Sequence, residues 1–195
     1  MTSVFIILLC YLIGSIPFSY LFTRLFTKQD IRKKGSGNVG ATNVLRTSGK
    51  SIALLALTGD LLKGVIAAWI GKHAGGQALL IICPVAAVIG HCYPVFLKFR
   101  GGKGVATAAG VILVLMPSVC LILLLSFIAI CAVSRYVSLG SVLAAALFPV
   151  MTIVITKSWP YFTMSLIIAL VVIYRHRGNI DRLRKGIEPK INDPA

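Results

Sequence analysis

Long apolar runs constrain this chain more than any other feature of its sequence. Three of them have about the 20 residues that a helix needs to cross the hydrocarbon core of a bilayer: Val4–Thr23, Ile52–Ile70 and Ala78–Leu97. Two further runs are shorter: Val142–Thr156 and Pro160–Tyr174. Of the 195 residues, 57% are hydrophobic and 13% are charged, whereas soluble domains average about 45–50% and about 25%. We therefore expect an all-α integral membrane protein, and the composition excludes an ordinary soluble domain or a disordered chain.

The number of spans depends on residues 105–133, where Met116-Pro117-Ser118 interrupts an apolar run of 29 residues. This segment could form one long helix or two short helices. Two helices place 17 basic residues on one side of the membrane and only Lys72 and Lys157 on the other, whereas one helix would send the six basic residues of the tail to the opposite side. Because Lys and Arg collect on the cytoplasmic side, the sequence predicts seven transmembrane helices, with the N-terminus outside and the C-terminus in the cytoplasm. Residues 1–195 are expected to form one transmembrane helical domain.

The chain is strongly basic. Twenty Lys and Arg residues oppose five Asp and Glu residues, which gives a formal net charge of +15. A nucleic-acid-binding protein can carry such a charge, but not on so apolar a chain, so we expect the lipid bilayer and no nucleic acid as a partner. Five cysteines lie in apolar runs without metal-ligand spacing, which predicts neither a disulfide framework nor a metal site. They are Cys10, Cys83, Cys92, Cys120 and Cys131.

The first basic loop, residues 35–46, is rich in glycine and small polar side chains. Its candidate ligand-binding residues are Ser36, Gly37, Asn38, Gly40, Thr42, Asn43 and Arg46. Glycine lets the backbone approach a ligand closely, and successive N–H groups in such turns form anion-binding nests. The loop is not a Walker A motif, because Ala41 stands where the phosphate-binding Lys would be. It could also be a flexible linker, but the Asn and Arg side chains among the glycines favour a phosphate site.

The second loop runs to a helix expected at Val105. Its candidate residues are His91, Gly101, Gly102, Lys103 and Gly104. Glycines and a Lys in front of a helix N-terminus form a ready phosphate site. The alternative is a positive stop signal at the membrane surface, for which Lys98 and Arg100 would be sufficient. The position of Lys103 between two glycines favours phosphate binding.

Two further segments are expected on the same side. The loop Ser134–Ser141 is a weak signal by itself, and its candidate residue is Ser141. Residues 174–183 carry His176 and Asn179 within a basic run. That run could lie at anionic lipid headgroups, but a His and an Asn suit the handling of a hydroxyl group better.

The five acidic residues limit the chemistry of the chain. Asp60 and Lys63 lie three residues apart in one span and would face one another. Such an intramembrane pair is a functional hypothesis by default, and a structural ion pair is the equal alternative. The acidic residues are too scattered for a two-metal carboxylate site, so no metal or other cofactor is expected. No Gly-x-Ser-x-Gly elbow supports a serine acyl-enzyme, and direct transfer between a phosphorylated molecule and a lipid-soluble one is what remains.

Five motifs, in their order along the chain, carry a resemblance: GSGNVGATNVLR, DLLKG, HCYPVFLKFRGGKGVAT, SLGS and RHRGNIDRLRKGIEPK. With Gly14-Ser15-Ile16-Pro17, they resemble the bacterial acyl-phosphate:glycerol-3-phosphate acyltransferase family over nearly the whole chain. The resemblance implies transfer of a fatty acyl group from acyl phosphate to the sn-1 hydroxyl of glycerol 3-phosphate. The product would be lysophosphatidic acid, formed in the first step of phospholipid synthesis. The resemblance also implies a multi-pass protein of the bacterial inner membrane with its active site on the cytoplasmic side.

The resemblance further implies roles for individual residues. Ser36, Arg46, Lys103 and Ser141 would bind phosphate groups, while His176 and Asn179 would hold the glycerol hydroxyls. Ser141, His176 and Asn179 are the residues expected at the chemical step. His176 is the candidate general base, because its ordinary pKa lies near neutral pH. A substrate phosphate could take the proton instead, and His176 would then position the acceptor.

Two other functions fit parts of the sequence. His176 and Asp181 spell His-x4-Asp, the signature of acyl-CoA-dependent glycerolipid acyltransferases, although the rest of that architecture is missing. A transporter or channel for an organic phosphate would suit a basic mouth on seven helices. Against a transporter, the polar residues gather on one side and no inverted repeat is visible.

Overall fold

The computed structural model describes residues 2–191 and 193, and every regular element in that part of the chain is helical. The all-α prediction is therefore confirmed. The chain divides into two compact units, one of residues up to Val111 and one of residues 112–193. The expectation of a single domain stays a prediction.

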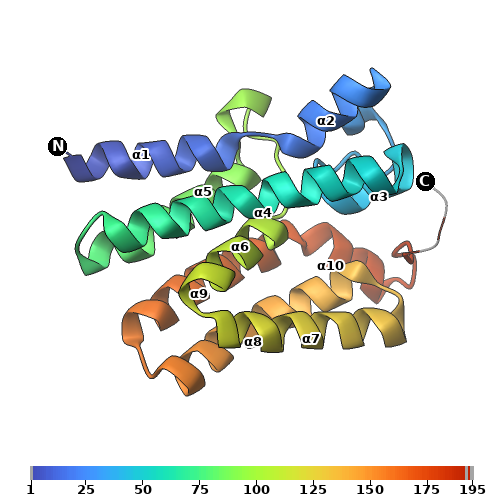
Figure 1. Ribbon diagram of the computed structural model, residues 1–195. Coiled ribbons are helices and arrows are strands. Elements are labelled where there is room, and N and C mark those ends of the chain that lie inside the picture. Colours follow the sequence, from blue (N-terminus) through green and yellow to red (C-terminus); the bar gives the residue numbers. More distant parts are fainter. Residues whose placement is uncertain (1, 192, 194–195) are drawn as a thin grey trace. The chain divides into compact units, whose positions relative to one another are not determined.

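The first unit is built on three long helices. They are α1 (Thr2–Ser15), α4 (Lys50–His73) and α5 (Gln77–Cys92). Figure 1 shows α1 lying along α5, and α5 in turn packs against α4. The shorter elements are α2 (Phe18–Thr27), η1 (Ile31–Lys33), α3 (Ala41–Ser48) and η2 (Val95–Leu97). Both α2 and α3 pack on α4, so the glycine-rich first loop is carried between two anchored helices.

The first apolar run is not one continuous helix. It breaks between Ser15 and Phe18, because Pro17 has no N–H group to continue the hydrogen-bond ladder of α1. The break leaves backbone carbonyls without helical partners in the middle of an apolar segment. This interruption becomes part of the site described below.

Glycines allow close contact between the helices of the first unit. A methyl group at Gly14 of α1 would lie 2.6 Å from Cα of Ala87 in α5. Gly90 of α5 faces the backbone of α1 in the same way, and Gly64 of α4 faces Thr107. Helices in lipid gain little from hydrophobic burial against one another, so such small residues permit the tight packing that holds them together.

The second unit contains α7 (Pro117–Ser134), α8 (Val137–Thr156), α9 (Trp159–Arg175) and α10 (Arg177–Arg184). The helix α8 lies along both α7 and α9 (Figure 1). Short turns join α7 to α8 and α8 to α9. The first contains Arg135 (φ 63°) and the second Lys157 (φ 51°), both in the left-handed conformation. Between α9 and α10 the helix axis bends by 57°.

Among the described residues, five helical segments are long and apolar enough to cross a membrane, or six if the bent pair of α9 and α10 counts as one span. The predicted interruption at residues 116–118 is confirmed, since α6 (Val105–Leu115) ends just before α7 begins. With 11 residues, α6 is about 16 Å long, roughly half the hydrocarbon thickness. Large apolar side chains face outward, such as Val133 and Trp159, which are 89% and 71% exposed. A multi-pass membrane protein follows, while seven spans and the orientation of the termini stay predictions.

We expect Gly14→Val to destabilise the first unit, because its side chain would have to displace the backbone of α5. Overpacking of this kind costs about 1–3 kcal/mol, which should lower the melting temperature of the detergent-solubilised protein by several degrees. Ser3→Val, at an exposed position of the same helix, is the control and should leave the melting temperature unchanged. Equal melting temperatures for the two variants would contradict this packing.

Candidate active site

The loop between α2 and α3 is organised around the buried side chain of Asn43. Its Nδ2 donates hydrogen bonds to three backbone carbonyl oxygens at 3.0 to 3.4 Å, those of Ile31, Lys34 and Asn38. Its Oδ1 accepts a hydrogen bond of 3.0 Å from the N–H group of Ser36. These bonds fix the backbone of the loop, so Asn43 positions the residues around it. Direct contact of Asn43 with a ligand stays a prediction.

The entrance to this loop is also fixed. Asp30 accepts hydrogen bonds from the backbone N–H of Arg32 and from its guanidinium group, the shortest at 2.7 Å. The guanidinium group also lies 5.0 Å from the ring centre of Tyr20. The hydrogen bond from the Arg32 side chain lowers the pKa of Asp30 to about 2, so the pair remains charged at neutral pH. Because hydrogen bonds hold this loop both at Asp30 and at Asn43, it is not a flexible linker.

The other candidate residues of the first loop are accessible to different degrees. Ser36 and Thr42 are exposed, while Gly37, Asn38, Gly40 and Arg46 are partly exposed. The backbone of Gly37 has a φ of 69°, a conformation that L side chains rarely adopt. A small anion can therefore reach this loop while its internal hydrogen bonds remain in place.

The second loop folds back on the end of α5. The N–H group of Gly101 donates to the carbonyl of Cys92 at 3.2 Å, and that of Gly102 donates to the carbonyl of His91 at 3.1 Å. Helix ends leave carbonyl groups without helical partners, and these two hydrogen bonds satisfy the last ones of α5. Lys103 follows directly and is partly exposed, and Gly104 (φ 88°) leads into α6.

Gly102 brings the two predicted phosphate loops together. A methyl group there would overlap Nε2 of His91 and would lie 2.7 Å from the carbonyl oxygen of Val39 in the first loop. Gly101 packs in the same way against Pro94 and the carbonyl of His91. The sequence predicts a phosphate site at these glycines, which stays a prediction, and the structure shows that the protein itself occupies the space of a side chain at both.

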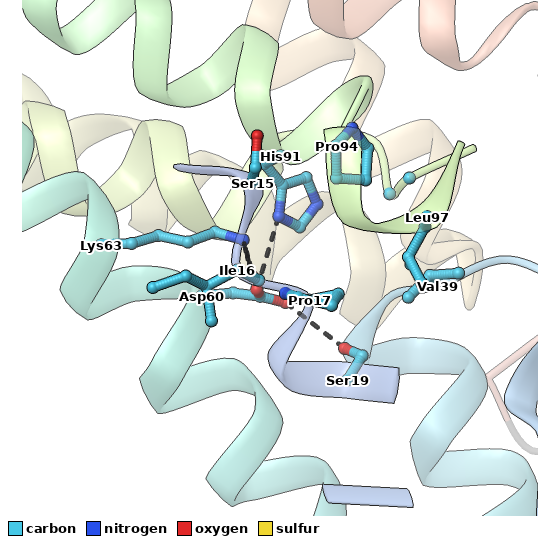
Figure 2. A pocket seen from close by; sticks show the side chains of 12 residues that line it. Ser15, Ile16, Pro17, Ser19, Val39, Asp60, Lys63, His91, Pro94 and Leu97 are labelled. Carbon is cyan, nitrogen blue, oxygen red and sulfur yellow. Dashed lines mark hydrogen bonds and ion pairs between the residues drawn. The ribbon is translucent and has the colours of Figure 1, made fainter. Parts of the chain in front are cut away.

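Below this contact lies a buried polar cluster centred on Asp60 of α4, which we call the Asp60 cluster (Ser19, Asp60, Lys63 and His91). Oδ1 of Asp60 lies 2.9 Å from Nζ of Lys63 and 3.4 Å from Nδ1 of His91. Oδ2 accepts a hydrogen bond of 3.3 Å from Ser19. Figure 2 shows these side chains around a pocket of about 10 Å³, a volume for about one water molecule. The predicted contact between Asp60 and Lys63 is confirmed.

In the second unit, His176 occupies the bend between α9 and α10 and is 2% exposed. Its Nδ1 lies 2.8 Å from the carbonyl oxygen of Val172. A carbonyl can only accept a hydrogen bond, so Nδ1 carries the proton and Nε2 is the basic nitrogen of the neutral imidazole. This is the tautomer that a general base needs.

Asn179 follows one turn later, and Glu188 fixes its side chain. Nδ2 of Asn179 donates to the carboxylate of Glu188 at 2.6 Å, and Nε of Arg182 donates to the same carboxylate at 2.7 Å. Burial raises the pKa of Glu188, but the nearby hydroxyl of Ser138 and the hydrogen bonds from Asn179 and Arg182 outweigh it and hold the pKa below its ordinary value. The hydrogen bond from its nitrogen to Glu188 fixes the orientation of the Asn179 amide.

The serines of α8 face the same region as this carboxylate. Ser138 lies beside Glu188, and Ser141 lies one helical turn further along the same face. Both side chains are buried. The hydroxyl of Ser141 donates to the carbonyl of Val137 at 2.8 Å, which leaves its oxygen as an acceptor for a second group.

The predicted residues thus form two groups. The first unit holds Ser36, Gly37, Asn38, Gly40, Thr42, Asn43, Arg46, His91, Gly101, Gly102, Lys103 and Gly104, and the second unit holds Ser141, His176 and Asn179. Within the first unit, the two loops meet at Gly102. Within the second, Glu188 links α10 to α8. A site that combines both groups belongs to the proposal below.

Two residues of these groups escaped prediction from sequence. Glu188 orients Asn179, and Ser19 completes the Asp60 cluster. The signal for Glu188 was present, since it is one of two acidic residues in the basic run from Arg175 to Lys190. The other, Asp181, is exposed and pairs with Lys185 at 2.9 Å.

This pairing bears on the His-x4-Asp interpretation. In such a pair the carboxylate orients the imidazole, but here the carbonyl of Val172 holds Nδ1 of His176 and Asp181 engages Lys185. Across residues 2–191 and 193, no three side chains of His, Cys, Asp or Glu lie close enough together to hold a metal ion.

Comparison with known proteins identifies relatives over nearly the whole chain. A family model described as glycerol-3-phosphate acyltransferase matches residues 4–186. A glycerol-3-phosphate acyltransferase of Syntrophomonas wolfei is 62% identical over 190 residues, covering 97% of each chain. Glycerol-3-phosphate acyltransferase 2 of Moorella thermoacetica is 46% identical, covering 96% of each chain.

Two solved structures are similar to this one. Both are of PlsY (YgiH), described as an integral membrane glycerol 3-phosphate acyltransferase, and both are 41% identical to this chain and cover 97% of it. The glycerol 3-phosphate form has a TM-score of 0.93 with 96% of its own chain covered, and the lysophosphatidic acid form has 0.91 with 95%.

We expect Glu188→Gln to lower the melting temperature near pH 7, because it removes the charged acceptor of two hydrogen bonds, each worth about 1.5–3 kcal/mol. The lowered pKa means that the unfolded chain binds more protons, so the carboxylate stabilises the fold at neutral pH. That contribution is lost as the pH falls below the ordinary value of 4.5 and through the lower folded pKa. The difference between wild type and variant should therefore shrink near pH 4. Asp181→Asn is the control and should change little; a pH-independent difference would contradict this account.

Proposed function

This chain belongs to the glycerol-3-phosphate acyltransferase family and is an acyltransferase, and from that premise we propose its full reaction. A fatty acyl group passes from acyl phosphate to the sn-1 hydroxyl of glycerol 3-phosphate. The bond between the acyl carbonyl carbon and the phosphate oxygen breaks, and a bond from that carbon to the glycerol oxygen forms. The hydroxyl proton passes to Nε2 of His176 or to the departing phosphate. The products are lysophosphatidic acid and inorganic phosphate.

The observation that carries this proposal is the fixed geometry of His176 and Asn179. The carbonyl of Val172 sets the imidazole in the tautomer with a basic Nε2, and Glu188 sets the amide of Asn179. A basic nitrogen and an amide oxygen one helical turn apart can both accept hydrogen bonds from the hydroxyls of a polyol. This arrangement supports a role in holding the acceptor and removing its proton.

The phosphate groups of the two substrates would bind to the loops of the first unit. Lys103 follows the glycine pair that caps α5, and Arg46 lies in α3 beside the fixed loop. Both side chains are partly exposed, and both suit a phosphate, Lys as a point charge and Arg as a two-pronged donor. Ser36 and Ser141 add hydroxyl groups, so the proposal brings the residues of both units to one site.

No covalent intermediate on the enzyme is proposed. Acyl phosphate is a mixed anhydride with a good leaving group, and proximity of two oriented substrates can lower the barrier by roughly 7–11 kcal/mol. The hydroxyl of Ser141 donates to a helix carbonyl, which supports binding and not nucleophilic attack. We also propose that no metal takes part, since the five acidic residues are scattered along the chain.

The proposed setting is the bacterial inner membrane. Seven spans, with the short α6 as one of them, place the basic loops and the C-terminus in the cytoplasm. There, water-soluble glycerol 3-phosphate can meet an acyl donor carried in the lipid. Outward-facing apolar side chains along the helices support this placement.

The reaction is tested with purified protein in detergent or a lipidic mesophase. Palmitoyl phosphate and glycerol 3-phosphate are supplied with EDTA, and palmitoyl-CoA replaces palmitoyl phosphate in a parallel assay. Lysophosphatidic acid from acyl phosphate in the presence of EDTA is the expected result, and analysis of the product by NMR locates the ester on the sn-1 oxygen. Product from palmitoyl-CoA alone would overturn the proposed donor. Loss of activity with EDTA, restored by a divalent cation, would overturn the metal-independent mechanism.

Variants of His176 and Lys103 should separate catalysis from binding. His176→Ala removes the basic nitrogen and should lower kcat far more than tenfold. Lys103→Met removes the charge and should raise the KM for glycerol 3-phosphate. His73→Ala and Lys98→Met make similar changes at exposed positions and should behave like wild type. Near-normal turnover of His176→Ala, or an unchanged KM for Lys103→Met, would remove that residue from the site.

A further inference from the structure

The Asp60 cluster has no assigned task in the proposed reaction. Asp60 and Lys63 are each 2% exposed and His91 is 7% exposed, and all three lie in segments apolar enough to span the membrane. A buried ion pair is weak support for stability, since its desolvation offsets the attraction between the charges. Ionisable residues in a span point to a function, so the surroundings of this cluster are informative.

On one side, the cluster holds the break in the first span. Nζ of Lys63 donates a hydrogen bond of 2.9 Å to the carbonyl of Ile16, which lies in the interruption at Pro17 and also accepts the N–H of Phe18. Ser19, just after the break, donates to Asp60. The hydroxyl of Thr107 in α6 donates to the backbone carbonyl of Asp60 at 3.0 Å. The cluster therefore links the first span, α4 and α6.

On the other side, the cluster reaches the second phosphate loop through His91. Asp60 contacts Nδ1 of the imidazole, and the opposite edge of the ring, at Nε2, abuts the backbone of Gly102. The carbonyl of His91 accepts the N–H of the same glycine. The next residue is Lys103. A chain of direct contacts thus runs from the carboxylate to the residue before the phosphate-binding Lys.

We propose that the Asp60 cluster is a positioning device for Lys103, with Asp60 orienting His91 and the His91 ring supporting the backbone at Gly102. His91 then acts on the segment that carries Lys103 and not on the substrate itself. Because Gly102 also contacts Val39, the same support sets the distance between the two phosphate loops. The proposal rests on the proposed role of Lys103 in binding the phosphate of glycerol 3-phosphate.

A matched pair of double variants tests the proposal. Asp60→Asn with Lys63→Met removes both charges but leaves an oxygen at position 60 that can contact His91. Asp60→Leu with Lys63→Met removes the same charges and that oxygen. A misplacement of about 1 Å can change an enzyme parameter by about a hundredfold. We therefore expect the Leu variant to raise the KM for glycerol 3-phosphate about ten- to a hundredfold, with the KM for acyl phosphate and kcat nearly unchanged. The Asn variant should raise this KM far less than the Leu variant.

The Lys103→Met background shows whether the effect passes through Lys103. In a double-mutant cycle, the Leu variant should add nothing to the KM for glycerol 3-phosphate once Lys103 is absent. Lys72→Met, on the exposed last turn of α4, is the control for the Lys substitution. His91→Phe leaves Asp60 and Lys63 in place and should raise the same KM, so the test survives even if the Leu variant does not fold.

Three results would overturn the proposal. Equal kinetics for the Asn and Leu variants would show that the contact with His91 is irrelevant. A fall in kcat together with the melting temperature, at constant KM, would mark the cluster as structural only. Full additivity with Lys103→Met would show that the effect does not pass through Lys103. If Lys103→Met by itself leaves the KM unchanged, the proposed phosphate role of Lys103 fails first, and the positioning proposal fails with it.

Discussion

A backbone polar group that leaves its helix inside a bilayer finds no water, so the protein must supply its partner. The constraint applies to the break in the first span. There the carbonyl of Ile16 accepts hydrogen bonds from Lys63 and from the N–H of Phe18. At the end of α5, the returning loop satisfies the last carbonyls, and at the bend after α9 the ring of His176 binds the carbonyl of Val172. The helices are interrupted where the candidate site residues lie, and those residues satisfy the interruptions.

The few acidic residues act as organisers of this basic protein. Asp60 gathers a hydroxyl, an ammonium group and an imidazole around one carboxylate. Glu188 gathers an amide and a guanidinium group in the same manner. In each case the carboxylate is buried while a candidate substrate-binding residue lies nearby. These two negative charges are thereby kept inside the protein.

Much of the fold was predictable because membrane helices follow simple composition rules. The apolar runs and the interruption at residues 116–118 appear in the structure as expected. The break before Pro17 was not predicted, because a proline within an apolar run is tolerated in many spans when neighbouring groups satisfy the backbone. Here that neighbour is Lys63, which is 47 residues from Ile16 in sequence.

The residues of the candidate site were predictable from the sequence, but the contacts that each of them makes inside the protein were not. Spacing does not reveal that a polar side chain binds its own loop, as Asn43 does. The glycines at 101 and 102 show the same ambiguity, because contact with protein and contact with substrate both require a missing side chain. Glu188 was missed because its partner Asn179 lies on a different element, and only the folded tail brings them together.

The hydrogen bonds of Asn43 have a thermodynamic consequence. A loop of glycines and small polar residues normally has many conformations, and a ligand that selects one of them opposes the lost entropy with part of its binding energy. Here one amide fixes the loop from Ile31 to Asn43 while the protein folds. The loop therefore loses its conformational entropy once, when the protein folds, and not again in each catalytic cycle. At the proposed phosphate site, an anion would therefore bind and leave without refolding the backbone of this loop.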